Sequence, residues 1–86
     1  MRVVVITKDQ TDYAREVSDY VFEFERRTGH ELEILDPESR EGISFTTTYD
    51  ILEFPTIVAL SESSQMLNMW KGRPLPTISE LSYFTR

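Results

Sequence analysis

Apolar residues divide the start of the chain into two segments with different periodicities. The first is a continuous β-branched run over residues 3–6, and a strand without polar alternation is typical of a sheet that is covered on both faces. The second spans Thr11–Thr28 and has apolar residues at helical spacing, with acidic residues in its first turns, Arg26 and Arg27 in its last turn, and a glycine after it. These patterns predict a buried strand, then a long amphipathic helix that Thr11 caps.

The rest of the chain continues this alternation. Further strands are predicted over residues 31–36, 56–60 and 66–70, a short helix over 43–51, and a last helix from the capping box that begins at Thr77. A polar turn makes the last two strands an antiparallel hairpin. The predicted order is β-α-β-α-β-β-α, an α/β fold with a four-stranded mixed sheet flanked by helices, in a single domain over residues 1–86.

Composition narrows the classes of function. The formal charge of −6 disfavours nucleic acid and anionic membranes as partners, because both select basic surfaces. No apolar run approaches the roughly 18 residues of a spanning helix, and no charged-then-apolar signal segment is present, so a cytoplasmic protein is expected. The carboxylates near loops lack metal-ligand spacing and a histidine partner, so no metal or other cofactor is expected.

Two stretches resemble the thioredoxin and glutaredoxin family. Residues 49–56, with the sequence YDILEFPT, resemble the approach to the strand that the family's cis-proline opens. Residues 3–14 resemble a glutaredoxin's first strand, lysine-bearing loop and active-site tetrapeptide, with Lys8 and Tyr13 matching the family's pattern. The resemblance extends over the whole chain and implies a thioredoxin-like fold in which Phe54–Pro55 is cis. The main rival, a ferredoxin-like split βαβ fold, should end in a strand, whereas this chain ends in a capped helix.

The family's sulfur chemistry is missing from this sequence. Thr11, Asp12, Tyr13 and Ala14 stand where a glutaredoxin carries Cys-Pro-Tyr-Cys, and the chain has no cysteine at all. Thiol–disulfide exchange needs a thiolate, so the chain cannot perform it whatever its fold. A hydroxyl nucleophile at Thr11 would need an adjacent base, and the single histidine, His30, lies about 27 Å away at the far end of the predicted helix. No catalytic residue is therefore predicted.

The resemblance does imply a binding surface that survives the loss of the sulfurs. In the family, the backbone of the residue before the cis-proline pairs with an extended peptide or with glutathione, and Phe54 would supply those groups here. The implied groove contains Lys8, Thr11, Asp12, Tyr13, Phe54, Pro55 and Thr56. The plainer alternative is that Thr11 only caps the helix, Tyr13 only packs and Lys8 is a solvated charge.

Three hypotheses of function follow. The first is a redox-inactive thioredoxin- or glutaredoxin-like domain that binds an unidentified protein or peptide through this groove. The second is a structural or self-association module that uses the strand over residues 66–70 as an edge. The chain is expected to be a monomer or a weak homodimer. The third is a glutathione-binding protein or a non-thiol enzyme, although the charge of Asp12 counts against an anionic ligand.

Phe22 and Trp70 each have two interpretations, and Met66 and Met69 have one geometric expectation. Phe22 lies off the apolar stripe of its helix, so it either packs under a loop or is an exposed contact residue. Trp70 is either an interface anchor or half-buried core at a strand end. Met66 and Met69 are three residues apart on one strand, so they are expected on opposite faces.

Overall fold

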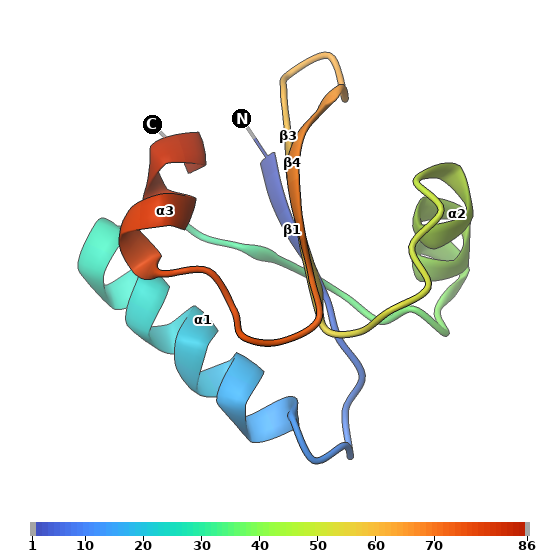
Figure 1. The fold of residues 1–86 in the computed structure, drawn as a ribbon, viewed down its shortest axis with the longest axis horizontal. Helices are drawn as coiled ribbons and strands as arrows, with labels where there is room; N and C mark the ends of the chain where they lie inside the picture. The colour runs from blue at the N-terminus through green and yellow to red at the C-terminus, as the bar shows by residue number, and fades with distance from the viewer. Residues whose placement is uncertain (1, 86) are drawn as a thin grey trace.

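The computed structural model describes residues 2–85, and its elements follow the predicted order. They are β1 (Arg2–Ile6), α1 (Ala14–Thr28), β2 (Glu33–Leu35), α2 (Arg40–Thr48), β3 (Thr56–Leu60), β4 (Met66–Lys71) and α3 (Ile78–Ser82), with a 3-10 turn over Tyr83–Thr85. Figure 1 shows α1 and α3 on one side of the sheet and α2 on the other. The predicted α/β fold with a mixed sheet flanked by helices is confirmed.

The sheet has the strand order β2-β1-β3-β4. β1 is parallel to β2 and antiparallel to β3, and β3 and β4 form an antiparallel hairpin. Residues 3–6 of β1 and all of β3 are buried, so the two central strands are covered on both faces, as the unbroken apolar run of β1 predicts.

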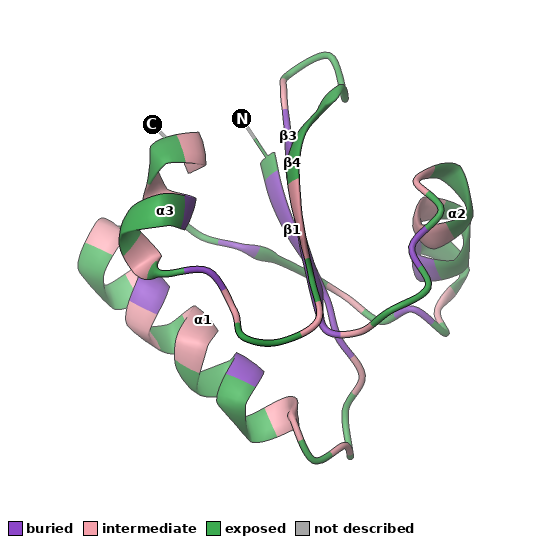
Figure 2. Cartoon of the chain, viewed as in Figure 1, coloured by how far each residue is buried: buried purple, intermediate pink, exposed green. Residues whose placement is uncertain are grey.

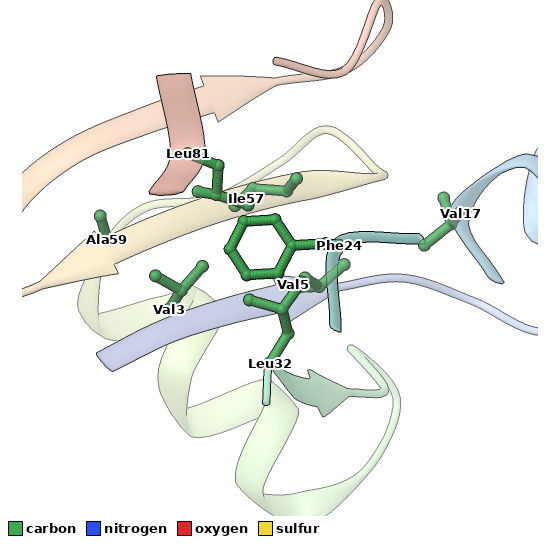
Figure 3. Packing of buried hydrophobic residues seen from close by; sticks show 8 residues of the cluster. All are labelled: Val3, Val5, Val17, Phe24, Leu32, Ile57, Ala59 and Leu81. Carbon is green, nitrogen blue, oxygen red and sulfur yellow. The ribbon is translucent and has the colours of Figure 1, made fainter. Parts of the chain in front are cut away.

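Each face of the sheet has its own apolar cluster. On the α1 and α3 side, the ring of Phe24 lies among side chains from β1, β3 and α3, including Val5, Ile57 and Leu81 (Figure 3). On the α2 side, alternate residues of the same strands, such as Val4 and Val58, pack with Ile51. Side chains alternate between faces along a strand, so both clusters use β1 and β3 in turn.

Helix α1 begins later than its sequence predicts, at Ala14 instead of Thr11. Thr11 does not cap it, because its hydroxyl donates to the carbonyl of Lys8 (3.1 Å) and the N-cap residue is Tyr13, without a side-chain cap. Figure 2 shows the burial pattern of an amphipathic helix along α1. Phe22 is 69% exposed, which decides between its two interpretations in favour of an exposed side chain.

Helix α2 spans Arg40–Thr48, so it begins and ends three residues before the predicted bounds. Ser39 is its N-cap and accepts a hydrogen bond from the Gly42 N–H (3.0 Å). A Cβ at position 42 would overlap the carbonyl oxygen of Asp36, so glycine is required where the helix passes the end of β2. Gly42, a residue type that is common in turns, is therefore part of the helix.

A bulge in the hairpin overturns one expectation. The register of β3 and β4 shifts between Ala59 and Leu60, so Met66 pairs with Leu60 and Met69 with Val58. Leu60 and Val58 belong to the same cluster, and paired residues project to the same face. Met66 and Met69 thus lie on one face of the sheet, not on opposite faces.

No helix within residues 2–85 is both long and apolar enough to cross a membrane.

Candidate functional site

The loops that follow β1, precede β3 and follow β4 lie together at one end of the sheet (Figure 1). Three contacts join them. The Lys8 ammonium is 5.4 Å from the centroid of the Phe54 ring, the Gly72 N–H donates to the Pro55 carbonyl (2.8 Å), and the Arg73 guanidinium is 3.9 Å from the Asp12 carboxylate. The structure therefore brings the two stretches that the sequence singled out into contact.

Lys8 is held between two partners. Its ammonium lies over the face of Phe54, in the range of a cation–π interaction, and is 3.5 Å from a carboxylate oxygen of Glu38. The Glu38 side chain is 75% exposed, so this ion pair is screened by solvent and is easily replaced. A positive charge is thus fixed beside the aromatic ring of residue 54.

Pro55 and Thr56 are buried and fully engaged. The Pro55 carbonyl accepts from Gly72, and the Thr56 hydroxyl donates to the Glu53 carbonyl (2.6 Å). The Phe54–Pro55 peptide bond is cis. Phe54 itself is only half-buried, and its main-chain N–H and C=O form no hydrogen bond with other residues in the range 2–85. Phe54 therefore presents one unpaired donor and one unpaired acceptor at this end of the sheet.

Thr11, Asp12, Tyr13 and Ala14 form a turn that leads into α1. The Ala14 N–H donates to the Thr11 carbonyl (3.3 Å), and the Tyr13 ring packs against the apolar cluster beneath α1. Asp12 is exposed and lies near Arg73, which also reaches Glu16 (3.4 Å). The negative charge of Asp12 is thus partly balanced by a residue from the loop after β4.

Sequence reasoning missed three residues of this region. Glu38 and Arg73 supply the ionic partners of Lys8 and Asp12, and Leu52 is an apolar side chain that is 82% exposed two residues before Phe54. Arg73 is also the first residue of a second cis peptide bond, to Pro74. Arg73 follows Gly72 in the loop after β4, and this loop reaches the same end of the sheet as Phe54. The position of Arg73 in this loop is the sequence signal that identifies it as a candidate site residue.

The described residues offer no arrangement for metal chemistry. Among residues 2–85, no group of three or more histidine, aspartate or glutamate side chains lies close enough to hold an ion. The chain has no cysteine that would add a ligand.

Solved structures of other proteins share this fold, and two of them illustrate it. Thioredoxin 1 from the thermophilic eubacterium Thermosipho africanus TCF52B superposes with a TM-score of 0.70 and 15% sequence identity, covering 99% of this chain and 90% of that one. A structure described as a malarial protein superposes with a TM-score of 0.68 and 14% identity, covering 96% and 90%. No family model matches the sequence, and no curated protein matches it. At such identity the likeness establishes the fold alone, which is the thioredoxin-like fold that the sequence predicts.

Proposed function

We propose that this chain, which has a thioredoxin-like fold without cysteine, binds an extended peptide segment of a protein partner at Phe54. The observation that carries the proposal is the unpaired N–H and C=O of Phe54 beside a buried, fully engaged Pro55. A peptide strand that pairs with one residue in β geometry uses both groups at once. Thiol–disulfide exchange is excluded because it needs a thiolate.

Side chains around Phe54 supply two kinds of contact for such a segment. Leu52 is exposed and apolar, and its burial by a ligand would be favourable. Lys8 offers a positive charge held over the Phe54 ring, and its pairing with the exposed Glu38 is replaceable. Successive side chains of an extended ligand point to opposite sides, so an apolar residue and a polar neighbour suit this surface.

The proposal is tested by capture of partners from a lysate of the source cells, with a screen of displayed random peptides as a defined probe. The variant Leu52→Asp is matched by Leu67→Asp, because both replace an exposed leucine and residue 67 lies on β4. Recovery that falls for Leu52→Asp and for Phe54→Ala but not for Leu67→Asp supports a site at Phe54. Equal recovery from the wild type and all three variants would reject it.

A second candidate is self-association through β4. β4 is an edge strand of six residues, and Met66 and Leu67 are 40% and 45% exposed. A long edge with apolar side chains is a template for pairing with another strand. Light scattering at increasing protein concentration tests it, since a mass that rises for the wild type but not for Leu67→Lys would assign the contact to this edge.

A further inference from the structure

A cavity of about 170 Å³ lies between α1 and the edge strand β2, and its lining includes Thr7 and Asp9, the two neighbours of Lys8 in the chain. The α1 residues that line it are Ala14, Val17, Ser18 and Val21, and Ile34 of β2 lines its other wall. Ile34 is 53% exposed, so the cavity opens on a flank of the molecule where an apolar side chain meets solvent.

Phe22 lies on the same flank of α1. It follows Ser18 by four residues, and Glu25, three residues further on, accepts a hydrogen bond from the Leu32 N–H at the start of the β2 segment (2.9 Å). Residues three and four apart are neighbours on a helix surface, so Phe22 is placed between a lining residue of the cavity and the contact to β2. Phe22 does not line the cavity itself, and helical spacing places its exposed ring next to Ser18, which does.

The cavity and the exposed ring match in size. An apolar cavity of about 150 Å³ is known to admit benzene, so a space of about 170 Å³ accommodates the ring of a phenylalanine. Because one copy presents both the ring and the cavity on one flank, two copies related by a two-fold axis can exchange them reciprocally.

Charges favour the antiparallel arrangement that such an axis produces. Asp9 lines the cavity at the end nearest the start of α1, and its carboxylate forms no ion pair within residues 2–85. With α1 and its copy antiparallel, Arg26 follows Phe22 by one turn, about 6 Å along the helix, toward Asp9 of the other molecule. Arg26 shares Glu23 with Arg27, so Glu23 keeps a partner when Arg26 turns to Asp9.

From this geometry we infer that the chain forms a weak two-fold dimer in which Phe22 of each copy fills the cavity between α1 and β2 of the other. The occupant of the cavity is thus a second copy of this chain. The ionic contacts between Arg26 and Asp9 flank the two rings. The contact does not include Leu52, Phe54 or the edge strand β4.

Sedimentation velocity from micromolar to millimolar concentration tests the inference. We expect a reversible rise to the mass of a dimer, with methyl resonances of Val21 and Ile34 shifting in parallel in NMR spectra. Phe22→Ala should raise the dissociation constant about a hundredfold, because each dimer loses two buried rings and each ring accounts for about a factor of ten. Leu52→Ala and Leu67→Ala should leave it unchanged.

A charge exchange tests the orientation of the two copies. Asp9→Arg and Arg26→Glu should each weaken the dimer, and the double variant should restore it, because the two new charges again meet across the axis. A monomer at every concentration would overturn the inference, as would a dimer that Phe22→Ala leaves intact. A dimer that only Leu67→Ala weakens would assign association to β4 instead. All substituted side chains are exposed, and circular dichroism verifies that each variant is folded.

Discussion

Tyr20 on α1 provides a sharp test of the energetics of this fold. Its ring packs against the cluster on the α1 and α3 face, and its hydroxyl oxygen is buried without a hydrogen-bond partner among residues 2–85. A buried polar group without a partner loses its hydration and gains nothing in return, at a cost of about 1–3 kcal/mol. We therefore expect Tyr20→Phe to stabilise the protein at neutral pH by about 1 kcal/mol, which is a rise of roughly 4–8 °C in Tm for a domain of this size.

The pH dependence gives a second signature. Burial, with a smaller contribution from the charge of Glu80, raises the pKa of Tyr20 to about 12, from about 10 in an unfolded chain. The folded state therefore keeps the phenol proton at a pH where the unfolded state has lost it. The corresponding stability is fully present below pH 10 and is lost as the pH rises toward 12. Because the ring is only half-buried, we expect this loss to be on the order of 1 kcal/mol.

Urea denaturation from neutral to alkaline pH measures both effects, and Tyr49→Phe is the matched control. The Tyr49 hydroxyl donates to the Ser64 carbonyl (2.9 Å), so removing it should destabilise the protein by about 1 kcal/mol, the opposite sign. The advantage of Tyr20→Phe over the wild type should widen above pH 10, because only the wild type carries the buried Tyr20 phenol. A destabilisation by Tyr20→Phe similar to that of Tyr49→Phe would refute the reasoning, because it would mean that the Tyr20 hydroxyl has a partner.

Three further predictions concern the fold and the site. Gly42→Ala should lower the free energy of unfolding, measured with denaturant, by about 3 kcal/mol, because the added methyl group meets the Asp36 carbonyl. Gly29→Ala, in open space at a φ of 74°, should lower it by only about 1 kcal/mol. Equal losses would contradict the close approach of α2 to Asp36. Phe24→Ala should lower the free energy of unfolding by about 3–5 kcal/mol, which is much of the total of about 4–13 kcal/mol for a domain of this length. The cooperative thermal unfolding transition should therefore be largely lost. A fall in Tm of only a few degrees would argue against the central place of Phe24 in the core. Glutathione at millimolar concentration should leave the amide resonances of Lys8, Tyr13 and Thr56 unshifted, because the exposed carboxylate of Asp12 and the net charge of −6 oppose an anionic ligand; saturable shifts there would revive the glutathione-binding alternative.

The sequence predicts well those elements whose patterns are set by burial. The β-branched run of residues 3–6 and the apolar stretch of 56–60 become the two central strands, because strands covered on both faces need apolar residues at every position. It predicts helix ends less well. The helix predicted over residues 43–51 is displaced by three residues, because Gly42 is typical of a turn, yet it lies inside α2 against the Asp36 carbonyl.

The candidate site also contains residues that the sequence identifies and residues that only the folded structure reveals. The resemblance to thioredoxins and glutaredoxins implies Lys8, Tyr13 and Phe54 as site residues, and the contact of Lys8 with Phe54 brings the two resembling stretches together. The partners Glu38 and Arg73 come from distant parts of the chain, and no local pattern specifies which charges meet. The bulge opposite Leu60 was equally hidden, because it depends on how two strands pair and not on either one alone.

The hydrogen bond from the Gly72 N–H to the Pro55 carbonyl has a consequence for selectivity. Proline has no N–H, and its carbonyl is occupied by the hairpin partner, so residue 55 offers nothing to an incoming strand. If a peptide binds as proposed, it pairs with Phe54 alone. A shift by one residue would turn every ligand side chain to the opposite face, and only shifts of two residues would keep both the main-chain hydrogen bonds and the faces. Such a surface would distinguish two peptides that have the same residues in a different order. The spacing of residues in a ligand would then matter as much as their chemistry.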